Sequence, residues 1–427
     1  MRVLIVGSGG REHTLTWKVA QSPMVSKIYC APGNAGMAQL AECVDIKVTD
    51  IPGICAFAGE QVIDLAVIGP DNPLFEGMAD ELRAAGIPTF GPSKAAAAIE
   101  GSKVFSKELL VKYGIPTGDF RVFDDPAGAS AYVEEISGGS ETLPIVVKVD
   151  GLALGKGVYV CDTKTQALNA VQDMMVRKIF GSAGDRILVE ERLEGQEASL
   201  IVITDGTSVV PLTAAQDYKR INDRDQGPNT GGMGCYSPVP VVPPETYDYC
   251  MRTVIMPAIA GMKAEGRAYT GALYAGIMLT RDGPKVLEFN ARFGDPETQV
   301  QLPLLETDLV QIFQASLAGS LDSLEVKCYN GCAVCVVVAS GGYPGSYETG
   351  KPISGLDEAG AMEGVTVFHA GTKVRDGRIV TSGGRVLGVT AVGDSFRTAR
   401  DRAYSAVEQI HFDGMQYRRD IGARVIA

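Results

Sequence analysis

The chain contains 427 residues, of which 45% are apolar, and its 51 acidic and 39 basic residues give a formal net charge of −12. This length predicts about two to four domains, and the acidic balance without a basic tract argues against binding to nucleic acid or to an anionic membrane surface. Nine scattered cysteines favour reduced thiols in a cytoplasmic protein, and we expect neither a signal peptide nor a membrane span, because no apolar run is long enough to cross a bilayer.

The N-terminal segment predicts a strand, a glycine-rich turn and a helix. An apolar run at 2–6 is followed by Gly-Ser-Gly-Gly-Arg-Glu-His at 7–13, and backbone amides at the start of such a helix bind phosphate. Glu12 replaces the third glycine of the dinucleotide fingerprint, and the next strand, at 27–30, ends without the acidic residue that holds the ribose of NAD. We therefore predict a phosphate-binding turn, with an ordinary tight turn as the alternative, and no nicotinamide site.

Strands and helices continue to alternate through residue 91, which predicts an open parallel sheet. Ligands bind such sheets beyond the carboxyl ends of the strands. The polar loops at 7–13, 32–36 and 69–73 would gather there.

A helical stretch at 93–114 carries Lys103 and Lys107 one turn apart, a spacing typical of a solvated face. A new unit follows, in which the apolar strand at 144–149 contains Lys148. A buried ammonium group requires an anionic partner. The glycine-rich turn at 150–157 leads into another strand, unlike a Walker loop, which opens a helix. We expect this turn to fold over phosphates as a flap.

The third unit begins with a predicted hairpin, 198–204 and 209–213, joined by Asp-Gly. The segment at 225–234 is rich in glycine, which favours either close backbone approach to a ligand or a disordered surface loop. Strands at 272–280 and 284–290 are expected to pair.

The end of that last strand carries the residues with the clearest chemistry. Alternation along a strand places Val286, Glu288 and Asn290 on one face, and the two polar side chains are hard oxygen ligands suited to magnesium or manganese. Arg292 offers a fork for a carboxylate or phosphate, and Asp295 follows in a Gly-Asp-Pro turn. The alternative is a strand end followed by a solvated polar turn.

The unit from about residue 326 is rich in strands and shows no catalytic cluster of its own. Cys332 and Cys335 lie in an apolar run, so a buried strand is favoured over a zinc or redox site. His369 and His411 have no companion at ligand spacing and are interpreted as structural. Ser395 is expected to cap the last helix.

Together these motifs resemble the phosphoribosylamine–glycine ligases, also called glycinamide ribonucleotide synthetases, of the ATP-grasp superfamily. The resemblance runs nearly end to end and is carried by residues 6–13, 31–36, 148–158, 216–220, 227–234, 288–299, 340–345, 369–372 and 420–422. Tyr218, Leu154 and Ala291 depart from the pattern without removing a metal or phosphate ligand.

The resemblance implies an α/β chain with an ATP-grasp fold, an N-terminal open parallel α/β domain and a C-terminal strand-rich α+β domain. The expected units are 1–119, 120–193, 194–325 and 326–427. The implied reaction joins glycine to 5-phosphoribosylamine with ATP through a glycyl phosphate, giving glycinamide ribonucleotide, ADP and phosphate in de novo purine synthesis. It also implies Mg²⁺ or Mn²⁺, a cytoplasmic monomer or weak dimer, and small-molecule partners only.

The resemblance also implies roles for individual residues. ATP is expected at Lys103, Lys148, Gly151, Gly155, Lys156, Gly157, Glu190, Glu191, Leu193 and Glu197. The other substrates are expected at Gly9, Gly10, Arg11, Glu12, Gly33, Asn34, Asp71, Asn229, Thr230, Gly231, Gly232 and Arg292. Glu288 and Asn290 would hold the metal, and Arg292, Asp295 and Asp217 would take part in catalysis.

Three alternatives stay open at this point. Another ATP-grasp ligase, such as a biotin carboxylase or a purine-pathway carboxylase, would share the ATP site but not the turn at 7–13. A dehydrogenase would use the N-terminal sheet. A non-catalytic nucleotide-binding module would bind ATP without turnover.

Overall fold

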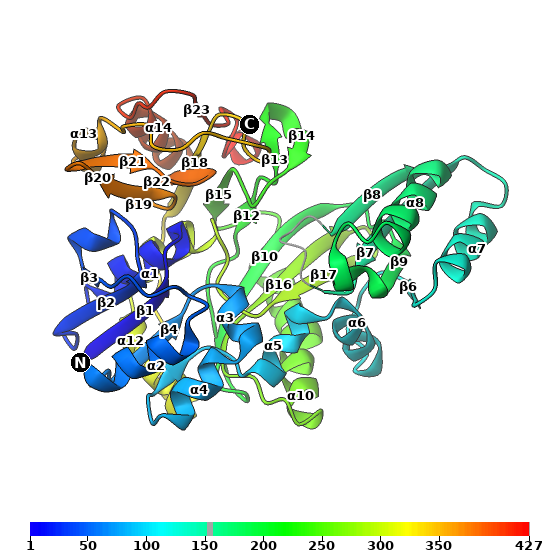
Figure 1. Ribbon diagram of the computed structural model, residues 1–427, viewed down its shortest axis with the longest axis horizontal. Helices are drawn as coiled ribbons and strands as arrows, with labels where there is room; N and C mark the ends of the chain where they lie inside the picture. The colour runs from blue at the N-terminus through cyan, green and yellow to red at the C-terminus, as the bar shows by residue number, and fades with distance from the viewer. Residues whose placement is uncertain (152–156, 427) are drawn as a thin grey trace.

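The computed structural model describes residues 1–151 and 157–426. Its N-terminal unit is a five-stranded parallel sheet of order β3-β2-β1-β4-β5 with helices against it (Figure 1), so the predicted parallel sheet is confirmed. The strands are β1 (Arg2–Gly7), β2 (Lys27–Pro32), β3 (Glu42–Cys43), β4 (Leu65–Ile68) and β5 (Thr89–Phe90). The helices are α1 (Gly10–Val19), α2 (Ile51–Glu60), α3 (Asp71–Glu76) and α4 (Met78–Ala84).

Two helices, α5 (Lys94–Gly101) and α6 (Lys103–Lys112), connect this unit to a projecting lobe (Figure 1). The lobe is an antiparallel sheet of order β6-β9-β7-β8 with its own apolar core against two helices. Its elements are β6 (Phe120–Phe123), α7 (Pro126–Ser137), β7 (Thr142–Val149), β8 (Val158–Thr163), α8 (Lys164–Val171) and β9 (Ile187–Glu191). The strands expected at 144–149 and 158–161 are therefore present and paired.

A second antiparallel sheet, of order β11-β10-β16-β17, lies between the lobe and the N-terminal unit (Figure 1). Its strands are β10 (Gln196–Thr204), β11 (Val209–Pro211), β16 (Gly271–Thr280) and β17 (Gly283–Asn290). The surrounding helices are α9 (Pro244–Cys250), α10 (Met256–Ala264), α11 (Thr298–Gln301) and α12 (Leu309–Ala318).

A bulge in β17 corrects the predicted strand faces. Val286 pairs with Ile277 and Glu288 pairs with Gly276, so Leu287 is an extra residue between them. Neighbouring residues of β16 point to opposite faces, and Val286 therefore lies on the face opposite to Glu288, in the apolar core. The expectation that they share a face was wrong, because the bulge shifts the alternation by one residue. Glu288 and Asn290 do share a face.

The C-terminal sheet has the order β12-β15-β18-β22-β19, with β23 beside β18. Its strands are β12 (Gln216–Asp217), β15 (Gly234–Ser237), β18 (Cys332–Ser340), β19 (Val365–His369), β22 (Arg385–Gly393) and β23 (Met415–Gln416). Its helices are α13 (Leu356–Gly360) and α14 (Phe396–Val407), which Ser395 caps as predicted by accepting a hydrogen bond from the Thr398 amide. Two hairpins flank the sheet, β13 (Arg220–Asn222) with β14 (Gln226–Asn229) and β20 (Thr372–Arg375) with β21 (Arg378–Thr381).

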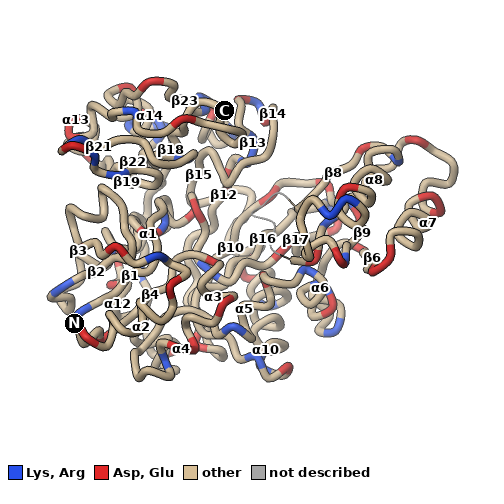
Figure 2. Tube along the Cα trace, in the orientation of Figure 1, with Lys and Arg blue, Asp and Glu red and all other residues tan. Residues whose placement is uncertain are grey.

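Both charge signs occur along every unit (Figure 2). Among the described helices, none is long and apolar enough to span a bilayer. Cys332 and Cys335 lie in β18 as free thiols, as expected for a strand.

Candidate active site

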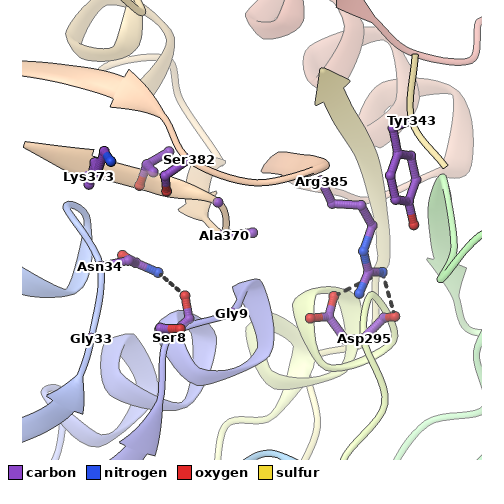
Figure 3. Close-up of a pocket in the computed structure, with 12 residues that line it drawn as sticks. Ser8, Gly9, Gly33, Asn34, Asp295, Tyr343, Ala370, Lys373, Ser382 and Arg385 are labelled. Carbon is purple, nitrogen blue, oxygen red and sulfur yellow. Dashed lines mark hydrogen bonds and ion pairs between the residues drawn. The ribbon is translucent and has the colours of Figure 1, made fainter. Parts of the chain in front are cut away.

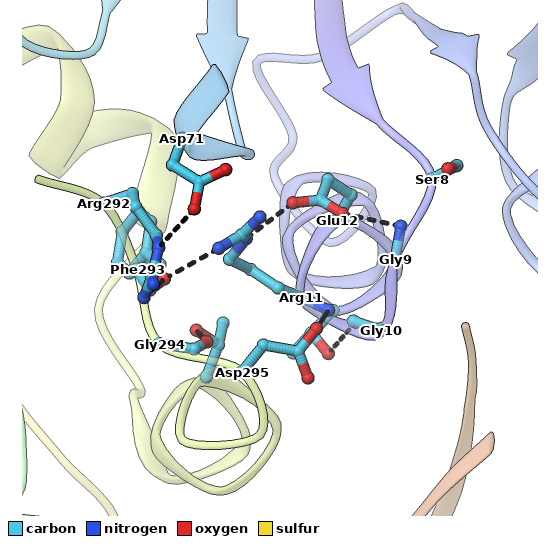
Figure 4. Close-up of polar contacts among 12 residues, drawn as sticks. Ser8, Gly9, Gly10, Arg11, Glu12, Asp71, Arg292, Phe293, Gly294 and Asp295 are labelled. Carbon is cyan, nitrogen blue, oxygen red and sulfur yellow. Dashed lines mark hydrogen bonds and ion pairs between the residues drawn. The ribbon is translucent and has the colours of Figure 1, made fainter. Parts of the chain in front are cut away.

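The turn between β1 and α1 is closed by the side chain of Glu12. Its Oε2 accepts a hydrogen bond from the Gly9 amide at 2.6 Å, and its Oε1 lies 2.6 Å from Arg11 Nε (Figure 4). Arg11 Nη1 in turn donates to the Phe293 carbonyl at 3.1 Å. A side chain at Gly7 or Gly69 would collide with Glu12. Glu12 thus ties the glycine turn together, and Arg11 ties the turn to the segment after β17.

A cavity of about 430 Å³ lies between this turn and the C-terminal unit (Figure 3). It is lined by Ser8, Gly9, Gly33, Asn34, Asp295, Tyr343, Ala370, Gly371, Thr372, Lys373, Ser382 and Arg385. Gly9, Gly33, Asn34 and Asp295 were expected at the site. Gly10, Arg11, Glu12 and Asp71 are not part of the lining. The C-terminal residues were missed by sequence reasoning, and their signals were the family-like motifs at 340–345 and 369–372, to which no role was assigned.

Asn34 is fixed by four hydrogen bonds. Its Nδ2 donates to the Ser8 carbonyl and to the His369 carbonyl, each at 2.9 Å, and its Oδ1 accepts from the Gly36 and Met37 amides. These contacts lock the turn after β2 against both the glycine turn and the C-terminal unit. In Figure 3, Lys373 and Ser382 lie near Asn34, at the end of the cavity away from Asp295.

Asp295 occupies the opposite end of the cavity with Arg385. Arg385 Nη1 lies 3.4 Å from Asp295 Oδ1 and donates to the Asp295 carbonyl at 2.8 Å and to the Gly231 carbonyl at 2.7 Å. Gln299 Nε2 also donates to Asp295 Oδ1 at 2.7 Å. Burial alone would raise the pKa of Asp295, but Arg385 and Arg11 outweigh it and hold that pKa below its ordinary value. The carboxylate is therefore ionised.

The glycine-rich segment at 225–234 is ordered by these contacts. Thr230 Oγ1 donates to the Lys219 carbonyl at 2.8 Å, and the Gly232 amide donates to Thr230 Oγ1 at 3.0 Å. Gly231 and Gly232 contact the cavity lining through Arg385, and the Gly231 amide also donates to Tyr343 Oη at 3.0 Å, whereas Asn229 ends the exposed strand β14. The alternative of a disordered surface loop is wrong.

A second, smaller cavity is lined by Lys103, Lys107, Lys148, Leu287 and Glu288, among others. Burial acts to raise the pKa of Glu288, but Lys103, Lys148, Lys219 and Arg292 outweigh it, and the pKa lies below its ordinary value. A ring of cations around one carboxylate suits a polyanionic ligand that a metal ion bridges to the protein.

The donor set on β17 fits a divalent ion held jointly with a nucleotide. Glu288 offers a carboxylate, and Asn290 offers its Oδ1, which accepts from Arg292 Nη2 at 3.1 Å. Across residues 1–151 and 157–426, no group of three or more His, Cys, Asp or Glu side chains is placed to hold a metal. Two oxygen ligands are too few for an all-protein cage but match the way Mg²⁺ is bound by one or two carboxylates together with phosphates and water.

Glu190 is the anionic partner that Lys148 was predicted to need. Its carboxylate lies between two buried ammonium groups, in contact with Lys148 Nζ and 2.9 Å from Lys107 Nζ. Lys107 also donates to Thr117 Oγ1 at 2.7 Å. The expectation of a solvated Lys107 was wrong, because α6 carries this residue into the joint between β7, β9 and β17, where it is only 4% exposed.

Among the described residues, the others expected near ATP do not line the smaller cavity. Glu191 lies 3.4 Å from Lys285, Glu197 pairs with Lys219, and Leu193 lies beside Gly118. Gly151 and Gly157 border the segment 152–156. Gly155 and Lys156 fall outside the described residues.

A half-buried acid–base cluster lies beside β17 and contains Asp217. Its carboxylate is 4.0 Å from Lys219 Nζ. Burial, reinforced by Glu297 and Glu197 and opposed by Lys219, raises the pKa of Asp217 to about 7. Burial acts to lower the pKa of Lys219, but the surrounding carboxylates Asp217 and Glu197 raise it. Asp217 is thus poised to exchange a proton near neutral pH.

Comparison with known proteins identifies the family of this chain. Three family descriptions match: the N domain of phosphoribosylglycinamide synthetase over 1–100, its ATP-grasp (A) domain over 101–298 and its C domain over 333–424. Phosphoribosylamine–glycine ligases of Vibrio cholerae serotype O1 and Pseudomonas aeruginosa are 52% and 50% identical over 430 residues, covering 100% of this chain and 99% of each relative.

Solved structures give the same result. The crystal structure of phosphoribosylamine–glycine ligase from Thermotoga maritima is 35% identical, with a TM-score of 0.85, and the match covers 98% of this chain and 100% of that one. The biotin carboxylase domain of the Hydrogenobacter thermophilus 2-oxoglutarate carboxylase shares the fold, with a TM-score of 0.73 and 17% identity over 97% of this chain and 91% of that one. The chain belongs to the phosphoribosylglycinamide synthetase family, the phosphoribosylamine–glycine ligases of the ATP-grasp superfamily.

Proposed function

We propose that this chain joins glycine to 5-phosphoribosylamine at the expense of ATP, forming glycinamide ribonucleotide, ADP and phosphate through a glycyl phosphate in de novo purine synthesis. One observation carries the proposal. The segment from Glu288 to Asp295 links a cation-rich cavity suited to ATP with a polar cavity suited to a phosphorylated sugar. The family and the names of the relatives support the same substrates.

ATP would lie over Lys103 and Lys148, with its adenine at the backbone of Glu190, Glu191 and Leu193 and its ribose at Glu197. The amides from Gly151 to Gly157, together with Lys156, would cover the phosphates. Glu288 and Asn290 would hold Mg²⁺ or Mn²⁺, which neutralises phosphate charge and so favours transfer to a carboxylate. The four cations near Glu288 support this placement.

The phosphoribosyl group would occupy the larger cavity. Its phosphate would bind the end near Asn34, Lys373 and Ser382, where an ammonium and a hydroxyl face the turns at 7–12 and 33–34. Its amine would then point toward Asp295, at the other end of the cavity. A phosphate monoester bound at Lys373 is the arrangement that the charge distribution favours.

The amide bond would form between the two cavities. Arg292 would orient the glycine carboxylate and then the acyl phosphate, and Asp295 would orient the amine. The amine nitrogen attacks the carbonyl carbon, phosphate leaves with the electron pair of the C–O bond, and the nitrogen loses a proton. Asp217, with its pKa near 7, is the base for that proton.

The four units 1–119, 120–193, 194–325 and 326–427 remain our proposed division. The separate apolar core of the lobe supports the second unit. The pairing of β15 with β18 joins the last two into one sheet. We further propose a cytoplasmic enzyme that is a monomer or weak dimer, and sedimentation velocity across a concentration series tests that state.

ADP release tests the activity. ATP, glycine and freshly prepared 5-phosphoribosylamine are supplied together and then with each omitted in turn. We expect ADP only when both glycine and the amine are present, and we expect Glu288→Gln to abolish most of it at limiting Mg²⁺ without changing the circular dichroism spectrum. ADP formed with a different acid or amine would refute the substrates, and ATP binding without ADP under any condition would favour a non-catalytic module.

A further inference from the structure

Glu100, at the C-terminal end of α5, makes contacts with the segment that follows the proposed metal ligands. Helix α5 packs against β17. Glu100 Oε2 accepts a hydrogen bond from the Ala291 amide at 2.7 Å, and Glu100 Oε1 lies 3.2 Å from Arg292 Nη2. Its side chain is only 10% exposed. One buried carboxylate therefore fixes both the backbone after Asn290 and the guanidinium of Arg292.

Arg292 is held on several sides and keeps one donor unused. Its Nη2 also donates to Asn290 Oδ1 at 3.1 Å, and its Nη1 donates to the Phe293 carbonyl at 3.3 Å. Its Nε lies 4.0 Å from Asp71 Oδ2 (Figure 4). That Nε is buried and donates a hydrogen bond to no partner among the described atoms. Leaving a buried charged donor unpaired is costly, so this N–H is oriented for an acceptor that a ligand supplies.

Glu100 acts through Arg292 and not as a metal ligand or a base. Both of its oxygens face protein N–H groups, one on the backbone and one on the guanidinium. Its negative charge offsets the arginine's positive charge in a site where water is largely excluded. A guanidinium anchored in this way presents its free N–H in one direction, and fixed donors bind a planar carboxylate better than mobile ones do.

We propose that Glu100 is a positioning residue that orients Arg292 so that its Nε–H faces the carboxylate of the acyl donor and the acyl phosphate formed from it. The inference rests on the proposed function for the identity of that donor, glycine. It assigns to α5 a part in recognising the carboxylic acid substrate, separate from the binding of ATP.

The test compares the KM for glycine with the KM for ATP in Glu100→Gln. The amide has the size of the carboxylate but lacks its charge, and its NH₂ group would oppose either the Ala291 amide or Arg292. We expect the KM for glycine to rise and kcat to fall, together by about 10- to 100-fold in kcat/KM, the usual effect of losing a hydrogen bond to a charged group. The KM for ATP should change less than about two-fold. Glu265→Gln, which removes an acidic partner of Lys112 and lines neither cavity, is the control and should leave both constants unchanged.

A double-mutant cycle with Arg292→Lys separates a positioning role from a structural one. If Glu100 acts through Arg292, adding Glu100→Gln to Arg292→Lys causes little further loss in kcat/KM for glycine. Additive losses would overturn the inference. Equal rises in both KM values would also overturn it. Such a result would mean that the substitution disturbs the junction between α5 and α6, where the Ser102 hydroxyl donates to Asp150 beside the glycine-rich turn.

Two further measurements keep the result interpretable. If Glu100→Gln does not fold, Glu100→Asp keeps the charge on a shorter side chain and should show the same selective rise for glycine, only smaller. A wild-type protein without glycine-dependent ADP release would refute the proposed function itself. An active wild type in which the kcat/KM losses of the two substitutions add in the double variant would refute only the role of Glu100.

Discussion

Replacing Glu190 with glutamine tests the charge balance at the base of the proposed ATP site. The side chains of Glu190, Lys107 and Lys148 are 5%, 5% and 8% exposed, so solvent screens their charges little. Burial acts to raise the pKa of Glu190, yet the two lysines outweigh it and lower that pKa. The folded protein therefore depends on this carboxylate being ionised at neutral pH.

Without the carboxylate, two buried ammonium groups face each other with no compensating charge. Breaking one side of a buried ion pair costs about 3–5 kcal/mol. Burial already lowers the pKa of Lys107, so deprotonation of a lysine limits the loss at high pH. We expect Glu190→Gln to lower the local unfolding free energy of β7 and β9 by ~3–5 kcal/mol at pH 7, and by less at pH 9 to 10.

Amide hydrogen exchange in β7 and β9 measures this change, because the lobe has its own core and can open separately. Glu134→Gln, which removes an exposed partner of Lys164, is the matched control and should have little effect. ATP bound as proposed would supply negative charge beside Lys148, so it should protect the variant more than the wild type. A loss below about 1 kcal/mol at pH 7, within the range of surface substitutions, would refute the reasoning.

Three further predictions concern pH and substrate binding. Burial and repulsion from His369 lower the pKa of His13 to about 3. Burial alone lowers the pKa of His369 to about 4. Unfolded histidines bind protons below about 6.5, so the free energy of unfolding should fall between pH 6.5 and 4 by up to ~2.7 kcal/mol per pH unit. His369→Gln should halve that slope in urea titrations, and an unchanged slope would contradict the assignment. Turnover should decline as pH falls through about 7, where Asp217 becomes protonated, and Asp217→Asn should remove this step from the pH–rate profile. Lys373→Met should raise the KM for 5-phosphoribosylamine about 10-fold with the KM for ATP unchanged, and equal changes in both would contradict a phosphate contact.

Local patterns predicted the elements well because each depends on neighbouring residues. The apolar run in β1 and the glycine turn after it are readable without tertiary information, and the same holds for Ser395 as the cap of α14. The requirement of Lys148 for an anion followed from its apolar surroundings alone. The identity of that anion, Glu190, did not, because it depends on β7 pairing with β9.

The errors arise where long-range pairing decides the outcome. The bulge at Leu287 reverses the face of Val286, and an alternating pattern cannot reveal an inserted residue. Lys107 has the helical spacing of a solvated residue, but the packing of α6 buries it. Lys373 lies just after the motif at 369–372 and Ser382 lies just after β21, and only the approach of the β20–β21 hairpin to the glycine turn makes them part of a cavity.

The segment from Glu288 to Asp295 explains why the site requires contacts from several units. It carries the proposed metal ligands at one end and the wall of the larger cavity at the other. Residues from three other parts of the chain hold this segment in place. Glu100 accepts a hydrogen bond from the Ala291 amide, Arg11 donates to the Phe293 carbonyl, and Arg385 donates to the Asp295 carbonyl. Phosphoryl transfer and amide formation need reacting atoms within about 3–3.5 Å of each other. A short segment that is anchored at three points by three other parts of the chain can hold the two cavities at a fixed distance from each other. The anchoring residues are therefore as important to the chemistry as the ligand-binding residues themselves.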